Sequence, residues 1–318
     1  MNVRPPLDEF EYGGWPPDIE LFAKQNAHIT FDTFKAYRKT VRPDLIWSPF
    51  VERLTRELER FGYAYEAGKR PKLAICCPPQ HGKSTGAEDL IAWLAGRNPN
   101  RKCIYASYAE ALGTRMSLNL QRTFKSDSYQ GLFPYIRVDV PGWTANTDLT
   151  EFCRFRGSFR STTINGPITG LELDLGILDD FVKGRAEANS KTARHKTWSW
   201  FSDDFLTRFS KDSALLAICT RWHIDDLLGR LKKKWPSLHI LTFPAIAEKD
   251  GADWRKKGEP LFPEHKPLDF LLERKRLMSE ASWQAEYMQQ PFLTGSGAIP
   301  IEKRASCRTS TCTRWRRP

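Results

Sequence analysis

Residues 72–96 read KLAICCPPQHGKSTGAEDLIAWLAG, and this stretch decides the fold that we expect. Its first part is apolar and has the length of one buried β-strand, and its last part has the composition of an α-helix that ends near Gly96. The turn between them contains Gly82-Lys83-Ser84, although Cys77 stands where a phosphate-binding loop usually begins with glycine. The order strand, loop and helix indicates that Gly-Lys-Ser is a working phosphate-binding loop rather than an accident.

Further apolar strands alternate with helical segments along the rest of the chain. We expect these strands at 102–108, 171–180, 213–220 and 238–245, together with a hairpin at 150–164 that turns at Arg156-Gly157-Ser158. Strands that are apolar throughout and separated by helices form parallel sheets covered on both faces. We therefore predict an α/β fold of the P-loop NTPase type (RecA/ASCE-like), with a mostly parallel sheet that binds its ligand at the carboxyl ends of the strands.

Length, charge and cysteine content restrict the class of protein. A chain of 318 residues buries roughly three-quarters of its unfolded surface, so it needs no disulfides to hold a core. The net charge of +11 favours a polyanionic partner such as nucleic acid, although a generally cationic surface explains it too. No apolar run approaches the roughly 20 residues that cross a bilayer, and the N-terminus has no secretion signal. The seven cysteines follow no disulfide spacing, so we expect a reducing cytoplasm and no membrane.

The loop after the first strand is expected to hold phosphates with successive backbone N–H groups at the start of a helix. Lys83 would reach the β- and γ-phosphates, and the Ser84 hydroxyl would bind Mg²⁺. Pro78 and Pro79 have no N–H group, but their restricted φ angles would stiffen the entry to the loop. The residues that we assign to ATP and phosphate binding are Pro79, Gln80, His81, Gly82, Lys83, Ser84 and Thr85.

Two acids end the apolar strand at 171–180. In phosphate-loop enzymes such acids hold Mg²⁺ and orient the attacking water. We assign Asp179 to the metal ion and Asp180 to the catalytic base, where aspartate is one methylene shorter than the more usual glutamate. An Asp-Asp turn after a core strand is the structural alternative. Thr220, at the end of another strand, is placed to sense the γ-phosphate, and we count Lys83, Asp180 and Thr220 as catalytic.

The residues after Thr220 have both structural and catalytic interpretations. Asp225 and Asp226 are expected to cap the following helix. His223 is either a proton-transfer group or a structural hydrogen-bonding residue, and the second is favoured. The run Lys232–Lys234 could contact a DNA backbone, but a solvated helix face is the simpler interpretation.

Four segments in this order resemble the ATPase region of tailed-phage terminase large subunits. They are PPQHGKS (78–84), GPITGLELDLGILDD (166–180), WSWFSDDFLTRF (198–209) and TRWHIDDLLGRL (220–231). The resemblance covers about residues 35–300. It implies an ATP- and Mg²⁺-dependent motor of a phage or prophage that moves double-stranded DNA into a procapsid in the host cytoplasm. It also implies a homo-oligomeric ring on the procapsid, with the portal protein and the terminase small subunit as partners.

The resemblance also predicts a division of the chain. We expect an N-terminal arm at 1–45, an ATPase core at 46–246, and a small, mainly helical linker or lid subdomain at 247–292. In the family a nuclease domain follows, but residues 293–318 contain only its expected start and a tail whose composition is typical of translation out of frame. We therefore predict no nuclease activity in this chain. A basic DNA-binding tail, or half a zinc site at Cys307 and Cys312, are the alternatives for the tail.

The sequence departs from the family pattern at several positions. Gln80 stands where relatives often have arginine, and Leu171-Glu172 replaces a common Arg-Gly. An arginine finger acting in trans is therefore unassigned, and its candidates are Arg156, Arg160 and Arg185. Two other functions stay open: a helicase-like or other nucleic-acid-dependent P-loop ATPase, and a catalytically silent remnant that binds DNA or portal.

Overall fold

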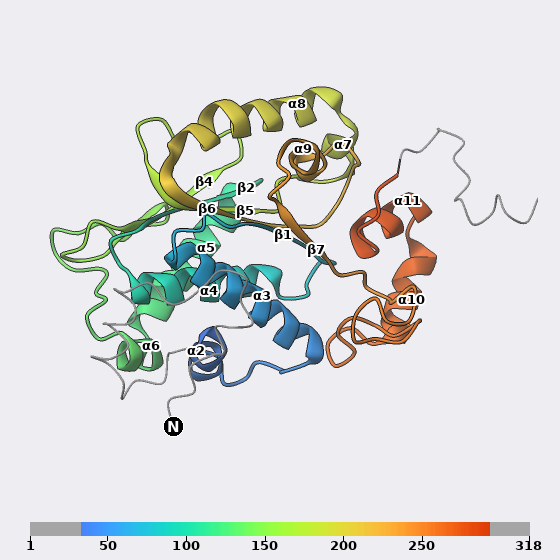
Figure 1. The fold of residues 1–318 in the computed structure, drawn as a ribbon, viewed down its shortest axis with the longest axis horizontal. Helices are drawn as coiled ribbons and strands as arrows, with labels where there is room; N and C mark the ends of the chain where they lie inside the picture. The colour runs from blue at the N-terminus through green and yellow to red at the C-terminus, as the bar shows by residue number, and fades with distance from the viewer. Residues whose placement is uncertain (1–32, 293–318) are drawn as a thin grey trace, which may run out of the picture.

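A seven-stranded sheet lies at the centre of the computed structural model, which describes residues 33–292 (Figure 1). The strand order is β3-β4-β2-β5-β6-β1-β7, and every neighbouring pair is parallel except β3 and β4. The strands are β1 (Lys72–Cys76), β2 (Lys102–Ser107), β3 (Leu149–Glu151), β4 (Ser158–Thr163), β5 (Leu173–Asp179), β6 (Phe209–Cys219) and β7 (His239–Thr242). The predicted mostly parallel α/β sheet is confirmed, and the predicted hairpin is the antiparallel pair β3–β4.

Helices cover both faces of this sheet (Figure 1). On one face lie α2 (Phe34–Val41), α3 (Pro49–Glu66), α4 (Lys83–Arg97), α5 (Glu110–Lys125) and α6 (Asp127–Leu132). On the other lie α7 (Arg185–Asn189), α8 (Lys191–Ser199), its π-helical continuation (Trp200–Phe205), a short 3-10 turn (Leu206–Arg208) and α9 (Leu227–Lys234). Each face buries its own apolar cluster, because parallel strands alternate their side chains between the two faces.

The start of the described chain is part of the core. Residues 33–45, which we placed in the N-terminal arm, contain α2, and Thr33 caps this helix by accepting the N–H of Ala36. Phe34 and Tyr37 of α2 are fully buried. Arg38 is buried as well and donates to the Asp89 carboxylate at 2.8 Å. This part of the expected arm is therefore a packed helix. Residues 1–32 and 293–318, with Cys307 and Cys312, lie outside the described residues.

The segment after β7 forms a separate layer beyond the β7 edge of the sheet (Figure 1). It contains α10 (Leu268–Leu277), α11 (Glu280–Ser282) and a π-helical turn (Trp283–Tyr287). Its small apolar cluster is distinct from the two clusters of the sheet and consists of Ala245, Leu271, Trp283 and Met288. We refer to residues 247–292 as the linker segment. None of the described helices is long and apolar enough to cross a membrane.

Candidate active site

The loop between β1 and α4 has the geometry of an anion cradle. Gly82 is the N-cap of α4 with φ +80°, a left-handed conformation that glycine adopts without strain. Gln80 is also left-handed, with φ +60°. The first N–H groups of a helix have no partner within the helix, so the first turn of α4, which includes Ser84 and Thr85, presents free donors to a phosphate.

Lys83 is the first residue of α4, and its side chain is buried beside two other predicted catalytic residues. Its Nζ donates to Thr220 Oγ1 at 2.9 Å and lies 3.2 Å from Asp180 Oδ2. Burial opposes a charge on Lys83, but the nearby carboxylates, Asp180 foremost, outweigh this effect and hold its pKa above the ordinary value. Lys83 is therefore a permanent cation at this site.

The strand order explains why residues about 140 positions apart meet. β6 lies between β1 and β5, and its last residue Cys219 pairs with Cys76 of β1. On its other side, Ile218 pairs with Asp179. Because the three strands are parallel, their carboxyl ends share one edge, and Thr220 therefore lies between the phosphate loop and the two acids.

Asp180 is held in a defined orientation. Its backbone is left-handed with φ +41°, and its N–H donates to the Ile218 carbonyl at 3.0 Å. Its Oδ1 accepts the backbone N–H of Thr220 at 2.9 Å, which leaves Oδ2 facing Lys83. One carboxylate therefore joins the end of β6 to the lysine of the phosphate loop.

Asp179 lies deeper and has one carboxylate oxygen without a partner. Its Oδ2 accepts the Tyr105 hydroxyl at 2.7 Å, whereas Oδ1 is buried and accepts no hydrogen bond. Burial raises the pKa of Asp179 to about 6, and the neighbouring Asp180 charge adds to this effect, while Lys83 and the hydroxyls of Tyr105 and Ser84 partly oppose it. Tyr105 was not predicted from the sequence, although its place near the end of the strand next to β5 is a usable signal.

The free oxygen of Asp179 suits a metal ion shared with a nucleotide. The Ser84 hydroxyl is close enough to this carboxylate to oppose the rise in its pKa, so both predicted metal ligands are together. Among residues 33–292 there is no group of three or more His, Cys, Asp or Glu side chains that could hold a metal by themselves. Mg²⁺ usually binds one or two protein oxygens and completes its shell with water and substrate phosphates. The residues present therefore fit Mg²⁺ that arrives with a nucleotide.

The sequence profile of the family "Terminase large subunit, T4likevirus-type, N-terminal" matches residues 75–306, which include the loop, both acids and Thr220. The chain belongs to this terminase family. A comparison with curated protein sequences found no match.

Solved structures of phage terminases resemble the chain. A mutant of the Thermus phage P74-26 large terminase ATPase domain is 14% identical with a TM-score of 0.53, over 80% of this chain and 97% of that one. The bacteriophage HK97 large terminase is 17% identical with a TM-score of 0.49, over 78% of this chain and 51% of that one. A large terminase from a thermophilic bacteriophage, in complex with ADP, is 13% identical with a TM-score of 0.39, over 79% and 52%. The chain spans about half the length of these last two proteins, and the P74-26 match supports a shared fold.

His81 of this terminase has its side chain turned into the protein. Its Nδ1–H donates to the Pro79 carbonyl at 2.8 Å, and its ring meets the Phe50 ring edge-on. Burial lowers the pKa of His81 to about 4, so the imidazole is neutral at pH 7. Among the residues assigned to phosphate binding, His81 can therefore contribute its backbone N–H but not its ring.

The linker segment contacts the phosphate loop through two residues that were not predicted from the sequence. The His265 Nε2–H donates to the Gln80 carbonyl at 3.0 Å, and Lys266 Nζ donates to Gln80 Oε1 at 2.9 Å. These residues are about 185 positions apart, and no local pattern marks either of them.

The candidates for an arginine finger lie in different settings. Arg185 is engaged within its own chain: it donates to the Trp222 carbonyl at 2.9 Å and to Ser282 Oγ at 3.1 Å, and it pairs with Glu286. Arg156 precedes β4 and Arg160 lies in its first half, so both are nearer the amino ends of the strands. The finger itself stays unassigned.

The residues after Thr220 are mainly structural. Asp226 caps α9 as predicted, with Oδ1 accepting the Gly229 N–H at 2.9 Å. The expectation of a cap at Asp225 is wrong, because its side chain pairs with two arginines, Arg194 and Arg230. His223 has the hydrogen-bonding role that we favoured, since its Nδ1 accepts the Asp225 N–H.

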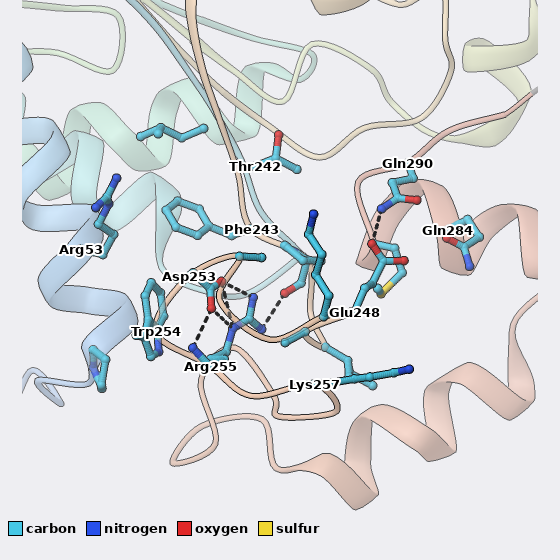
Figure 2. A pocket seen from close by; sticks show the side chains of 18 of the residues that line it. Arg53, Thr242, Phe243, Glu248, Asp253, Trp254, Arg255, Lys257, Gln284 and Gln290 are labelled. Carbon is cyan, nitrogen blue, oxygen red and sulfur yellow. Dashed lines mark hydrogen bonds and ion pairs between the residues drawn. The ribbon is translucent and has the colours of Figure 1, made fainter. Parts of the chain in front are cut away.

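The structure also has a wide cleft of about 1970 Å³ (Figure 2). It opens between the start of α3, the end of β7 and the linker segment, and both acidic and basic side chains line it. Figure 2 shows Arg255 inside the linker segment, bonded to Asp253. Arg255 also donates a hydrogen bond to the Pro244 carbonyl at 3.0 Å. None of the predicted site residues lines this cleft, so it is separate from the phosphate loop.

Proposed function

We propose that this terminase chain hydrolyses ATP and is the ATPase part of a viral motor that packages double-stranded DNA into a procapsid. The observation that carries the proposal is the meeting of Lys83, Asp180 and Thr220 at the carboxyl ends of three adjacent parallel strands. A structural Asp-Asp turn would not explain why Asp180 pairs with the lysine of the phosphate loop and why Asp179 keeps an unpartnered, buried oxygen.

Binding of the nucleotide is assigned to the loop Pro79–Thr85. The N–H groups of the first turn of α4 would hold the phosphates, and Lys83 would contact the β- and γ-phosphates. Asp179 and Ser84 would hold Mg²⁺, which neutralises charge on the phosphates and helps to orient them. Neutralisation by the metal also suits Asp179, whose raised pKa reflects an unfavourable buried charge.

Hydrolysis is assigned to Asp180 and Thr220. Oδ1 of Asp180 is held by the Thr220 N–H, and Oδ2 is the atom available to accept a proton from the attacking water. In the structure Lys83 Nζ lies 3.2 Å from this oxygen. When Lys83 turns toward the phosphates, Oδ2 is free to act as the base. Thr220 contacts both Lys83 and Asp180. A change in either side chain when the nucleotide is hydrolysed would therefore be transmitted through Thr220 to the segment after β6.

The wider assembly follows from membership of the family and from charge. The net charge of +11 suits a DNA-binding partner. We propose that portal protein and terminase small subunit are the other partners, and that the chain works as a homo-oligomeric ring. Residues 46–246, with α2 packed against them, would be its core, and residues 247–292 its linking subdomain. The separate apolar cluster of the linker segment supports this division. The location in the host cytoplasm belongs to the same proposal.

Steady-state ATP hydrolysis tests the proposal. We would compare wild type, Lys83→Ala and Lys257→Ala with Mg²⁺ and linear duplex DNA, at high protein concentration so that a ring can form. Lys257 is an exposed linker lysine and serves as the matched control. We expect at least ~100-fold loss in Lys83→Ala, because electrostatic stabilisation of a phosphoryl group is lost, and little change in Lys257→Ala. Circular dichroism would verify that Lys83→Ala is folded. Equal turnover in all three proteins would refute the assignment.

A further inference from the structure

The turn before α10 reaches the phosphate loop through two neighbouring residues. His265 bonds the carbonyl of Gln80, and Lys266 bonds its side-chain oxygen. Both contacts meet the same loop residue, and that residue has a left-handed backbone. The linker segment is therefore in direct contact with the group of residues proposed to hold the triphosphate.

The place of this turn is determined by the rest of the linker segment. Gln289 is buried, and its Oε1 accepts the backbone N–H of Arg221, next to Thr220. Arg185 of α7 bonds Ser282 and Glu286 on the same side. The linker segment therefore contacts the protein near the end of β6 as well as at the phosphate loop. These two contacts lie on either side of the candidate active site.

The acids beside the phosphate loop favour a further cation when an anionic nucleotide is bound. Two carboxyl groups, those of Asp179 and Asp180, adjoin the phosphate loop, and the amino group of Lys83 lies 3.2 Å from Asp180 Oδ2. Lys83 therefore already faces an acid before a nucleotide binds. A triphosphate is itself strongly anionic, so Mg²⁺ alone has to offset both sets of negative charge unless a further side chain helps.

Lys266 is a cation beside the loop whose contacts are all neutral. Its Nζ meets the Gln80 amide oxygen and lies 4.7 Å from the centre of the Phe270 ring. Within residues 33–292 it forms no ion pair, whereas Arg221 pairs with Asp226 at 2.9 Å. Lys266 is half-buried, but its hydrogen bond to Gln80 is exposed to solvent, so its flexible side chain can leave an amide oxygen for a phosphate, with which its hydrogen bond is stronger.

His265 has a different part in this contact. It binds the carbonyl of the peptide unit between Gln80 and His81. In a trans peptide the C=O and N–H groups point in opposite directions. The bond to His265 therefore holds the His81 N–H on the side of the peptide that faces away from the linker segment, and so positions one donor of the loop.

We propose that Lys266 is a nucleotide ligand, whose ammonium group binds the outer phosphate of the triphosphate held by the loop, with His265 as a positioning residue for the loop. The linker segment then distinguishes the triphosphate from the diphosphate through a direct contact. This inference rests on the proposed ATPase function, because it assigns a further ligand at the same site.

Equilibrium binding of Mg²⁺–ATPγS and Mg²⁺–ADP, measured by titration calorimetry, tests the inference without turnover. The proteins are the full chain as wild type, Lys266→Ala, Lys266→Arg, the phosphate-loop variant Lys83→Ala and the control Lys257→Ala. We expect Lys266→Ala to weaken ATPγS about 10-fold and ADP less than about 3-fold, since ADP has no outer phosphate. Lys266→Arg keeps the charge and should recover most of the ATPγS affinity. Lys257→Ala should match wild type.

Three results would overturn the inference, and they differ in whether the proposed ATPase function is also refuted. If Lys266→Ala binds both nucleotides like wild type while Lys83→Ala binds neither, the contact is structural and the ATPase proposal stands. If Lys266→Ala weakens ADP as much as ATPγS, the residue supports the loop and does not bind the outer phosphate. If wild type binds neither nucleotide, the proposed function and the inference fail together.

Discussion

Lys83 and Lys266 both lie at the phosphate loop, but they differ in burial and in the charge of their partners. Lys83 is buried at the start of α4, between Thr220 and Asp180, whereas Lys266 is half-buried and reaches Gln80 from the linker segment through a solvent-exposed hydrogen bond. The first has a charged partner and the second has neutral ones. A buried charge is costly to leave alone, so the Lys83 contacts persist until a phosphate replaces them. A solvent-exposed hydrogen bond exchanges its partner at little cost, which suits a contact that forms and breaks with each nucleotide.

The comparison also separates two kinds of acid. Asp180 is held by the Thr220 N–H and paired with Lys83, whereas Asp179 has a hydroxyl partner and a free buried oxygen. The first arrangement favours a carboxylate in a defined orientation, and the second favours a carboxylate that gains from a metal ion. The two acids are neighbours in the sequence, and only their different hydrogen-bond partners in the structure distinguish their roles.

The largest expected effect is the loss of ATP turnover when Asp180, the partner of the buried Lys83, is changed. Asp180→Asn should reduce ATP turnover at least ~100-fold, because a general base contributes about 10²–10⁴ in rate. Asparagine still accepts the Thr220 N–H, so nucleotide binding should remain within a few-fold of wild type. Turnover and ATPγS binding measured on the same protein would check this. Normal turnover in the variant would remove Asp180 from the role of base.

The second effect concerns stability. Asp179→Asn removes an unfavourable buried charge and keeps an acceptor for Tyr105, so without Mg²⁺ it should raise the free energy of unfolding at pH 7 by about 1–3 kcal/mol. The folded-state pKa of about 6 lies above the unfolded value, so between pH 4 and 6 the folded wild type binds more protons than the unfolded chain. Its stability relative to the variant therefore falls as pH rises through this range and is constant above it.

Urea unfolding of both proteins at pH 4, 5, 6 and 7 would measure this difference. His81 has the opposite dependence, since its pKa of about 4 makes the folded state lose stability as pH falls below about 6.5. His81 is present in both proteins, so its contribution cancels in the difference. A stability difference that does not change with pH would contradict the assigned burial of the Asp179 charge.

A smaller effect is expected where the linker segment meets the end of β6. Arg185→Ala removes the bonds to Trp222, Ser282 and Glu286, and should reduce stability by about 1–2 kcal/mol. Hydrogen exchange near 280–289 should become faster, whereas exchange in β1 should be unchanged. Lys257→Ala is the control. Unchanged protection near 280–289 would mean that Arg185 does not attach the linker segment.

The smallest expected effect lies at the loop contact. His265→Ala should weaken Mg²⁺–ATPγS binding by about 2–3-fold, because it removes one exposed hydrogen bond to the Gln80 carbonyl. The same calorimetric titration as for Lys266 would detect it. A loss larger than that in Lys266→Ala would reverse the roles that we give to the two residues.

Much of the fold could be predicted because it depends on local patterns. Apolar runs of strand length, the helix after Gly82 and the acids that end β5 are all visible in short windows of sequence. Asp226 was recognised as a helix cap for the same reason. The packed helix α2 was missed, because its buried Arg38 and Tyr37 look like surface residues until Asp89 and the aromatic core are in place.

The sequence by itself determined the strand-loop-helix unit, the alternation that produces a parallel sheet, and which side chains stand at the carboxyl ends of its strands. These follow from backbone hydrogen bonding and side-chain periodicity, which act over a few residues. Only the tertiary structure decided that Tyr105 bonds Asp179, that Asp180 holds Thr220, and that Lys266 reaches Gln80. Such contacts join residues 40 to 186 positions apart, and they depend on how whole elements pack.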